Sequence, residues 1–280
     1  MKLNGILLEA GSTIVELTNW DNRLGSYSEG DWAVWSGTGA AYRWSTALRG
    51  GSGDWVRQEC YETGSVFSSY CWFDGDEAND AALLAKGWTA ALRSGSGEIS
   101  YDGDSIKVTG DGSSGFDAAG PIKNPANITT GSSVWAAGEY ALAGATSIYD
   151  FLPFNFRDGS YQVKFSYSSS NIRIVRSNAG TSPQVLQLLP NAEGQFVGST
   201  FKHFAFHASP YAAGGTVGKI ACWVDHSIEP YYFGSRALIS DAGGAFIRGA
   251  YASDLNGSAN PSHGCSFYAK NFTCGGNLNS

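Results

Sequence analysis

Short runs of alternating hydrophobic and polar residues, separated by tight-turn signals, constrain this chain most strongly. Aromatic and β-branched side chains alternate with polar ones over residues 161–167, which is the period of two that a β-strand requires. Asp158-Gly159 precedes this run, and Asp102-Gly103 separates two further alternating segments. Asp-Gly between such segments predicts a hairpin, because glycine takes the positive φ that the turn needs. The pattern therefore predicts antiparallel sheet.

Further strands are expected at residues 172–175, 184–189, 201–207, 220–224 and 245–250. Only residues 78–86 indicate a helix, which Asn79 or Asp80 could cap and Gly87 could end. Glycine is 37 of the 280 residues and hydrophobic residues are 42%, enough to fill a core between frequent turns. These features predict an all-β protein with a β-sandwich or jelly-roll architecture, of concanavalin-like or phage-tail-like type.

An internal repeat lies in the first half of the chain. Residues 44–54 and 88–98 share Trp, Ala, Leu, Arg, Gly, Ser and Gly at an offset of 44 positions. A third copy does not follow in the sequence, which disfavours a propeller or solenoid. Residues 110–127 are rich in Gly, Ser, Asp and Pro and form a candidate boundary. We expect a repeat-bearing β domain over residues 1–125 and a C-terminal β-sandwich over residues 130–280.

The acidic balance and the cysteine count bear on partners and compartment. The net charge of −7 argues against binding of nucleic-acid phosphates. The first residues lack the features of a signal peptide, and no apolar run is long enough for a membrane helix, so we expect cytoplasmic synthesis and no membrane insertion. The five cysteines are expected to be mostly buried free thiols. Pairing of Cys60 with Cys71, or of Cys265 with Cys274, stays open.

Two groups of residues could bind metal ions. His203 and His207 lie four positions apart, but on a strand this separates them by about 13 Å, too far for one zinc ion. Four carboxylates and one amide fall within seven residues before the predicted helix, and Asp74, Asp76 and Asp80 are the candidate ligands of a structural Ca²⁺. The alternative is a solvated turn. No other cofactor is expected.

Aromatic and basic residues of the N-terminal part are the candidate binding groups. Trp32 and Trp35 lie on opposite faces of one predicted strand and could stack on a sugar ring; alternatively, such rings fill the core. Arg49 and Arg93 occupy equivalent positions of the repeat, each before a Gly-Ser-Gly stretch and an acidic residue. If the copies share a conformation, both guanidinium groups could bind a carboxylated sugar. Alternatively, each arginine pairs with the acid that follows it.

Catalytic signatures are weak in this sequence. Glu59 and Glu62 come nearest to the carboxylate pair that glycosidases use, but they run into a predicted turn. The sequence has no Gly-x-Ser-x-Gly elbow, P-loop or dinucleotide fingerprint. Cysteine–histidine catalysis stays open, because its partners need not be neighbours in sequence. We expect that the chain is not an enzyme.

Short strands rich in Gly, Ser, Asn and Trp occur here together with an internal duplication, an acidic balance and no recognisable signal peptide. In this combination the chain resembles tail-fibre, baseplate and other accessory virion proteins of tailed bacteriophages. The resemblance is one of style over the whole chain and carries over no functional residue. It implies a virion location and a homo-oligomer, with a trimer favoured, that contacts other virion proteins and binds a cell-surface glycan.

We therefore predict a structural or attachment protein of a bacteriophage tail that binds a host-surface glycan or neighbouring virion subunits. The first alternative is a polysaccharide-acting enzyme or carbohydrate-binding module with a concanavalin-like jelly roll. The second alternative is a capsid or tail decoration protein. Glycan binding without product would support attachment, whereas product formation would support the enzyme.

Overall fold

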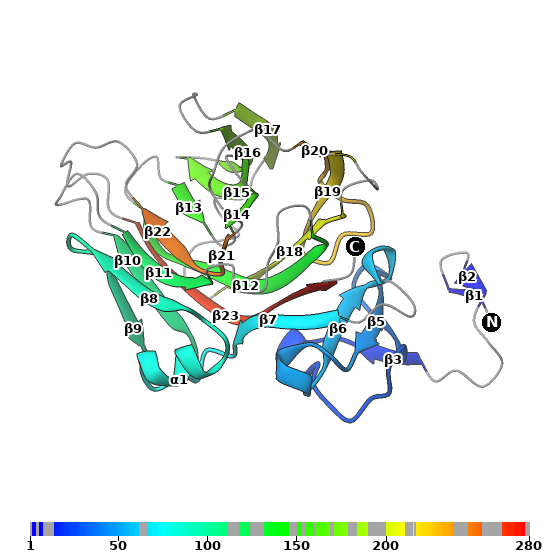
Figure 1. Cartoon of the computed structure of the whole chain (residues 1–280). Helices are drawn as coiled ribbons and strands as arrows, with labels where there is room; N and C mark the ends of the chain where they lie inside the picture. The colour runs from blue at the N-terminus through cyan, green and yellow to red at the C-terminus, as the bar shows by residue number, and fades with distance from the viewer. Residues whose placement is uncertain are drawn as a thin grey trace.

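The computed structural model describes residues 2–3, 6–7, 14–61, 67–110, 118–123, 132–145, 150–152, 155–158, 161–168, 171–178, 184–189, 200–210, 215, 217–237, 246–253 and 265–277. Within these ranges the chain is built almost entirely of β-strands, as predicted (Figure 1). Two large sheets enclose the main core, and a smaller sheet lies against the outer side of one of them. A two-stranded ribbon of β1 (Lys2–Leu3) and β2 (Ile6–Leu7) precedes them.

Sheet A has eight strands in the order β20-β19-β18-β12-β23-β10-β9, with β7 also paired to β23. All its pairings are antiparallel, and the two longest strands, β12 and β23, lie side by side at its centre. Its strands are β7 (Phe67–Phe73), β9 (Glu98–Tyr101), β10 (Ile106–Gly110), β12 (Val134–Ala145), β18 (Lys202–Ala208), β19 (Val217–Val224), β20 (Tyr232–Ala237) and β23 (Cys265–Asn277).

Sheet B has nine strands in the order β13-β22-β11-β21-β14-β15-β16-β17, and β8 pairs with β11. β21 and β22 follow each other closely along the chain, and both pair with β11. The strands of sheet B are β8 (Ala90–Ser94), β11 (Ala118–Lys123), β13 (Asp150–Leu152), β14 (Asn155–Asp158), β15 (Tyr161–Ser168), β16 (Asn171–Asn178), β17 (Gln184–Leu189), β21 (Phe246–Arg248) and β22 (Tyr251–Ser253).

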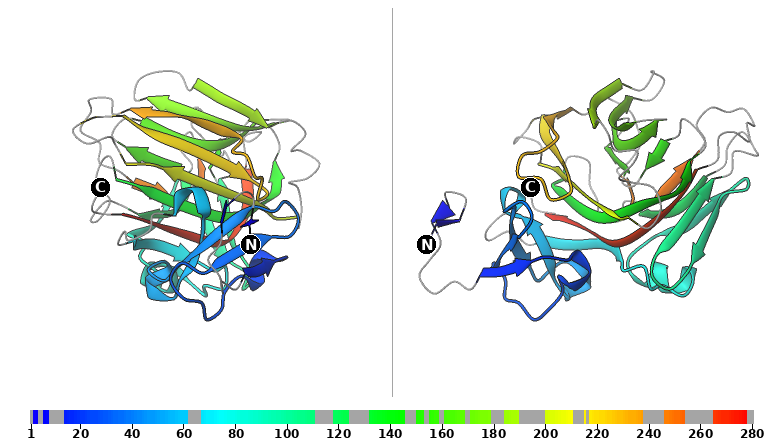
Figure 2. Two further views of the ribbon diagram at one scale, coloured as in Figure 1. Left: turned by 90° about the vertical axis from the view of Figure 1, so that its right-hand side faces the viewer. Right: turned by 180° about the vertical axis from the view of Figure 1, so that it is seen from behind.

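A third sheet forms what we call the N-terminal module, residues 14–61. It has four strands, with β3 parallel to β4 and the other pairs antiparallel. Figure 2 shows the module, coloured blue, beneath the long strands of sheet A. Its elements are β3 (Ile14–Leu17), η1 (Trp20–Asn22), β4 (Trp32–Trp35), β5 (Ala41–Ser45), η2 (Arg49–Gly51), β6 (Asp54–Arg57) and η3 (Gln58–Cys60).

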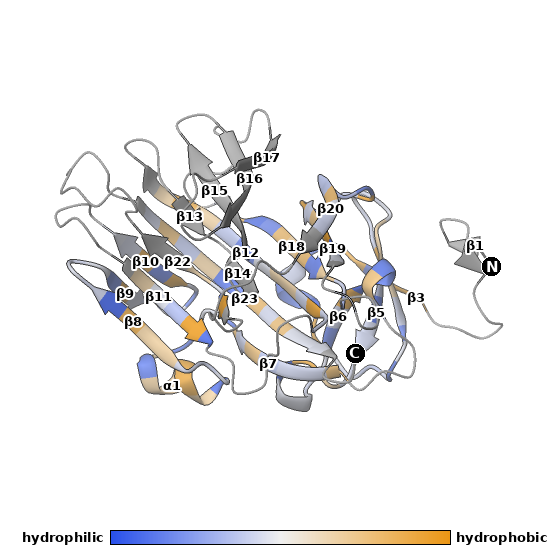
Figure 3. Ribbon diagram, turned by 45° about the horizontal axis from the view of Figure 1, so that its top comes forward, coloured by the Kyte–Doolittle hydropathy of each residue, from blue (hydrophilic) through white to orange (hydrophobic). Residues whose placement is uncertain are grey.

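Strand β12 is covered on both of its faces. Val134 and Ala136 pack in the core between sheets A and B, whereas Trp135 and Ala137 pack under the N-terminal module. All four side chains are buried. Because successive side chains point to opposite faces, a strand covered on both faces has a continuous rather than an alternating hydrophobic sequence. Hydrophobic positions accordingly recur along the central strands of sheet A (Figure 3), and the sequence here lacks the alternation that predicts the other strands.

The single helix in the described residues is α1 (Asp80–Ala85), as the sequence predicts. The side chain of Asn79 caps it by accepting a hydrogen bond of 3.0 Å from the backbone N–H of Ala82. Gly87 follows with φ +91°, and a Cβ there would lie 2.5 Å from the carbonyl oxygen of Tyr70. Only glycine satisfies both the positive φ and this close approach.

The predicted hairpins and strands are present. Tyr101 lies opposite Ile106 across the Asp102-Gly103 turn, and Asp158 lies opposite Tyr161 in the β14–β15 pair. The other strands expected from alternation correspond to β16, β17, β18, β19 and β21. Local pattern was sufficient for these elements, because a hairpin is decided within about a dozen residues.

The predicted division at residues 125–130 does not separate the sheets. Strands β7 to β11 precede that boundary, yet they pair with strands of the C-terminal part in both large sheets. The sheet that stands apart ends at Arg57. Pairing between strands far apart in the sequence leaves no local signal, so composition placed the boundary in the wrong position.

The internal repeat is not a structural repeat, which corrects the expected duplication. In the first copy Arg49 begins the 3₁₀ helix η2 with φ +53° and is buried. In the second copy Arg93 lies within strand β8. The same residues form a tight turn in one copy and an extended strand in the other, because β8 pairs with β11 whereas the first copy packs against β7.

Cys60, Cys71, Cys222 and Cys274 are buried free thiols, as predicted. The side chain of Cys265 lies outside the described residues. Within the described part of the chain, no helix has both the length and the apolar character needed to cross a membrane.

Candidate functional site

The predicted calcium ligands do not form one site. Asp74 and Asp76 lie close to Glu77, but Asp80 points elsewhere, to Arg93. The ammonium group of Lys86 lies among the three acids, 2.6 Å from Asp74 and 2.5 Å from Glu77. Burial would raise the pKa of Asp74, but hydrogen bonds from Lys86 and Arg49 lower it. The ammonium group of Lys86 therefore neutralises the negative charge of the acids that the sequence predicted to bind Ca²⁺.

Arg49 and Arg93 are both engaged within the chain, and neither pairs with the acid that follows it in the repeat. The Arg49 Nη2 atom lies 2.6 Å from Asp74 and its side chain is buried. The two terminal nitrogens of Arg93 donate to the carboxylate of Asp80 at 2.7 and 2.8 Å. The predicted acid partner of Arg49, Asp54, instead binds Arg23. The two guanidinium groups therefore do not present equivalent surfaces to a ligand.

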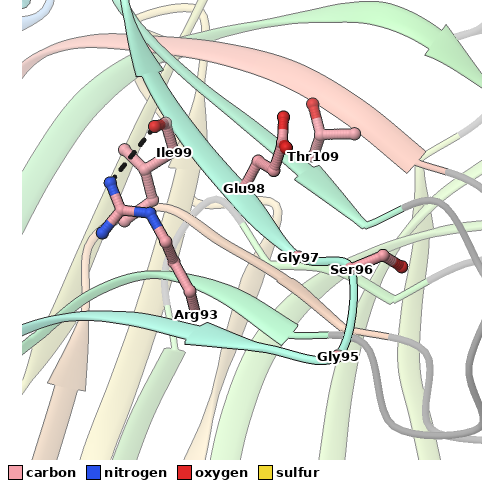
Figure 4. A pocket seen from close by; sticks show the side chains of 7 residues that line it. All are labelled: Arg93, Gly95, Ser96, Gly97, Glu98, Ile99 and Thr109. Atoms are coloured by element: carbon pink, nitrogen blue, oxygen red, sulfur yellow. Dashed lines mark hydrogen bonds between the residues drawn. The ribbon is translucent and has the colours of Figure 1, made fainter.

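A shallow hollow beside the β8–β9 turn contains one of the predicted binding residues. Arg93 extends beneath it toward the carbonyl of Ile99, while Glu98 and Thr109 project side by side from neighbouring strands (Figure 4). The hollow is lined by Arg93, Gly95, Ser96, Gly97, Glu98, Ile99 and Thr109. Because Asp80 already neutralises Arg93 and Glu98 adds a second negative charge, this hollow is unsuited to an anionic sugar.

The tryptophans of the N-terminal part are core residues, as the alternative reading of the sequence proposed. Trp20, Trp44 and Trp55 are fully buried in the module. Trp32 is 9% exposed and carries the guanidinium of Arg43 at 4.3 Å from its ring centroid. Trp35 stacks on His226 at 3.7 Å. These contacts occupy one face of each ring, and Trp35 is partly exposed.

The histidines that the sequence singled out as a zinc candidate are separated, as expected. Both lie on strand β18, where His203 is buried and His207 is partly exposed. The ring of His203 stacks on that of His226 at 3.8 Å, beneath the N-terminal module. Burial lowers the pKa of His203 well below its usual value and, with Arg57 nearby, lowers that of His226 to about 3. The two neutral, stacked imidazole rings contribute to packing. Because both are buried, they are not accessible to a polysaccharide.

Carboxylates do meet beside this stack, although the sequence could not show it. Asn271 donates hydrogen bonds of 2.7 Å to both Asp21 and Glu139, and Lys270 binds both oxygens of Asp21. Burial raises the pKa of Glu139. Burial would also raise the pKa of Asp21, but hydrogen bonds from Lys270 and Asn271 lower it. These bonds join η1 to β23, so the group ties the module to sheet A.

The strand register of sheet B brings together a different set of residues. Ile247 is fully buried in the core between the two large sheets. It lies opposite Phe156 of β14, which therefore shares its face of the sheet. The next residue, Arg248, falls on the other face because successive residues of a strand alternate. We call this other face the Arg248 face.

A row of polar residues crosses the Arg248 face on three adjacent strands. Arg248 of β21 lies opposite Asn155 of β14, and Asn155 lies opposite Lys164 of β15. Neighbouring strands are about 4.8 Å apart, so the row spans about 10 Å from Arg248 to Lys164. This is about the reach of two sugar units.

The rows on either side mix polar and apolar residues, because Phe246 lies opposite Arg157 and Leu188 lies opposite Arg173. Arg157 lies opposite Gln162 on one side of the central row, and Ser166 lies opposite Arg173 on the other. Each row is two residues further along the strands, or about 7 Å away. Three arginines and one lysine therefore share this face, and acidic residues are absent from these three rows of β14, β15, β16 and β21.

A tyrosine joins the same face from the neighbouring strand β22. Ser253 lies opposite Ala118 and Arg248 lies opposite Ile122. Ala118 and Ile122 are four positions apart on β11, so they share a face, and Ser253 shares it with them. Tyr251, two positions before Ser253, belongs to that face as well. The Arg248 face thus combines cations, an amide and a phenol.

Sequence reasoning missed this surface for a definite reason. The alternation of Gln162, Lys164 and Ser166 with aromatic residues was visible, and it placed them on one face of a strand. Their meeting with Arg248 depends on the long-range pairing of β14 with β21. An arginine that follows the buried Ile247 on a short strand is a weak local signal.

No protein-family description and no curated protein matches this sequence. Solved structures do resemble its fold. The endo-β-1,4-glucuronan lyase of the fungus Trichoderma reesei is 12% identical, with a TM-score of 0.51 over 75% of this chain and 97% of its own. Alginate lyase Aly36B is 12% identical, with a TM-score of 0.51 over 74% of this chain and 96% of its own. A carbohydrate esterase of the Shiga toxin-encoding bacteriophage phi24B has 12% identity and a TM-score of 0.49 over 76% and 100%.

These similarities show a jelly-roll β-sandwich, which is the predicted fold class. They also correct the expectation that the chain is not an enzyme. The finding that stands against it is that both structures with a TM-score of 0.51 are polysaccharide lyases. The sequence-based expectation was wrong because it sought catalytic groups that are neighbours along the chain, whereas a sheet assembles them from separate strands.

Proposed function

We propose that this chain is an enzyme that cleaves an acidic polysaccharide by β-elimination, with its site on the Arg248 face of sheet B. The observation that carries the proposal is the row of Arg248, Asn155 and Lys164 on adjacent strands. The likeness of the fold to a glucuronan lyase and an alginate lyase supports it. Glucuronan and alginate are polymers of uronic acids, and the cations of the Arg248 face would attract their carboxylates.

The elimination makes specific demands on a site. It removes the proton at C5 of a 4-linked uronate and expels the glycosidic oxygen at C4, which leaves a C4–C5 double bond. The C5 proton becomes acidic when the charge of the adjacent carboxylate is neutralised. A site therefore needs cationic or amide donors for the carboxylate, a base for the C5 proton and an acid for the leaving oxygen.

The residues of the central row match these demands by chemical type. Arg248 and Asn155 are assigned to the carboxylate, because a guanidinium binds it through two parallel hydrogen bonds and an amide adds a third donor. Lys164 and Tyr251 are assigned to proton transfer, since amines and phenols both serve as general acids and bases. Arg157 and Arg173, in the flanking rows, are assigned to the carboxylates of neighbouring sugars.

The decisive experiment follows the absorbance of the unsaturated product on polyglucuronate and alginate, with a neutral β-glucan as the control substrate. We expect product from at least one acidic polymer and none from the neutral one. Lys164→Ala should lower kcat by roughly 10²-fold or more, the usual contribution of a proton-transfer group. Arg157→Ala should mainly raise KM, because it removes binding to a neighbouring sugar.

Lys219→Ala is the matched control, because Lys219 is an exposed cation on a strand of sheet A. Its activity and melting temperature should equal those of the wild type. A wild-type protein that forms no product from any polysaccharide would overturn the proposal. So would a Lys164→Ala variant with full activity.

The virion location, the trimer and the contacts with other virion proteins stay predictions from the sequence. The same assay addresses the attachment function, which requires binding of a glycan without release of product. A protein that retains a polyuronate on a column and leaves it uncleaved would favour attachment over lyase activity.

A further inference from the structure

The core between the two large sheets contains two cysteines that face each other. Cys71 of β7 and Cys274 of β23 are direct partners in the antiparallel register. Both are fully buried and belong to the same hydrophobic cluster, so they share the inner face of sheet A. Of the four cysteines whose side chains are described, only these two are strand partners.

This arrangement meets the geometric requirement for a disulfide. Directly opposite residues of antiparallel strands have Cα atoms about 4.5 or 5.5 Å apart, depending on the type of pair. Disulfides span Cα separations of about 4.4–6.8 Å, so either type of pair falls within the range. Directly opposite residues of paired strands have their side chains side by side on the same face of the sheet, so the two thiols are neighbours.

We propose that Cys71 and Cys274 form a cross-strand disulfide when the chain folds under oxidising conditions. The two S–H bonds break and one S–S bond forms, while a small-molecule disulfide such as oxidised glutathione accepts the two electrons and two protons and becomes two thiols. The bond joins a strand of the N-terminal half to the last described strand of the chain, and so closes a very long loop. Such a closure restricts the unfolded chain strongly.

The surroundings determine when the bond can form. Burial raises the pKa of the Cys274 thiol well above its usual value, and Cys71 raises it further. A thiol needs to ionise before it attacks a disulfide, so the folded protein should oxidise slowly. During folding the two strands meet while solvent still reaches them, and the exchange is then fast.

The test refolds the reduced, denatured protein with and without a glutathione redox pair, then counts free thiols after denaturation in an alkylating reagent. Of the five cysteines in the sequence, we expect all to be free without oxidant and three with it. Mass spectrometry of a non-reduced digest should find one linked pair, the β7 peptide with the β23 peptide. The oxidised protein should melt roughly 5 °C higher.

Cys222→Ala is the matched control, because Cys222 is equally buried on the inner face of sheet A but lies opposite Tyr232 and Phe206. It should still lose two thiols on oxidation, whereas Cys71→Ala should lose none. Five free thiols after oxidative refolding, or a linked pair other than Cys71 with Cys274, would overturn the proposal. The peptide mapping uses the wild-type chain, so the result does not depend on the folding of either variant.

Discussion

At the centre of sheet A both faces are buried, but they are buried in different ways. Toward sheet B the buried residues are almost all apolar, such as Leu142 and Phe272. Toward the N-terminal module the buried groups include His203, Arg23 and Arg57. The inner face is held by apolar packing, whereas the outer face also needs the right polar partner at each position.

The charged groups beneath the module show what this difference means. Arg23 and Asp54 form a fully buried ion pair with two hydrogen bonds of 2.9 Å. Arg57 donates to the backbone carbonyls of Ser227 and Ile228, which belong to the segment between β19 and β20. The Arg23–Asp54 pair holds the module together internally, whereas the Arg57 bonds specify how the module docks on the rest of the chain. An apolar contact would tolerate several positions.

The largest expected effect comes from breaking the buried ion pair. Asp54→Leu leaves the charge of Arg23 buried without its partner, and it should lower the free energy of unfolding by about 3–5 kcal/mol. Chemical denaturation followed by tryptophan fluorescence measures this, because many of the tryptophans lie in the module.

The double variant Arg23→Met with Asp54→Leu is the informative control, because it removes both charges together. It should recover most of the stability that Asp54→Leu loses. A double variant as unstable as the single one would show that shape, and not the unpaired charge, limits this face.

A pH dependence should come next in size, and it should belong to the outer face. The pKa of His226 is about 3 and that of His203 is also depressed, whereas both are near 6.5 in the unfolded chain. The unfolded chain therefore binds more protons below pH 6.5. Stability should fall by about 1.4 kcal/mol per pH unit for each histidine as the pH drops from 6.5 toward 5.

His203→Phe tests this, because it retains a ring beside His226 and Trp20 but does not titrate. Its unfolding free energy should fall less steeply between pH 6.5 and 5 than that of the wild type. Of the neighbouring groups, Asp21 has a lowered pKa and titrates below this range, and Arg57 and Tyr42 have raised pKa values and keep their charge state over it. Burial raises the pKa of Glu139, but this contribution is common to the variant and the wild type. Equal slopes for the variant and the wild type would contradict the assignment.

The smallest effect is expected on the inner face. Leu142 is fully buried among apolar residues, and Leu142→Met conserves its volume. Its cost should stay below about 1.5 kcal/mol and should not change between pH 5 and 8. A loss comparable to that of Asp54→Leu would remove the contrast between the two faces.

Local sequence predicted some of the strands that carry the candidate site, but not the site residues or their assembly. The alternation over residues 161–167 placed Lys164 on one face of a strand, and the Asp158-Gly159 turn paired that strand with β14. No pattern within the chain indicated that Arg248 would lie beside Asn155. That neighbourhood depends on β21, a strand too short to show a period of its own.

By itself the sequence determined the elements that local chemistry decides. The period of two and the Asp-Gly turns specified an antiparallel β-protein, and Asn79 and Gly87 set the ends of its helix. Only the tertiary structure decided which strands are neighbours. Strands that pair can lie far apart in the sequence, so a short stretch of sequence does not show which of them pair. For the same reason two nearly identical stretches around Arg49 and Arg93 have different conformations: each adopts the form that its neighbours in space require.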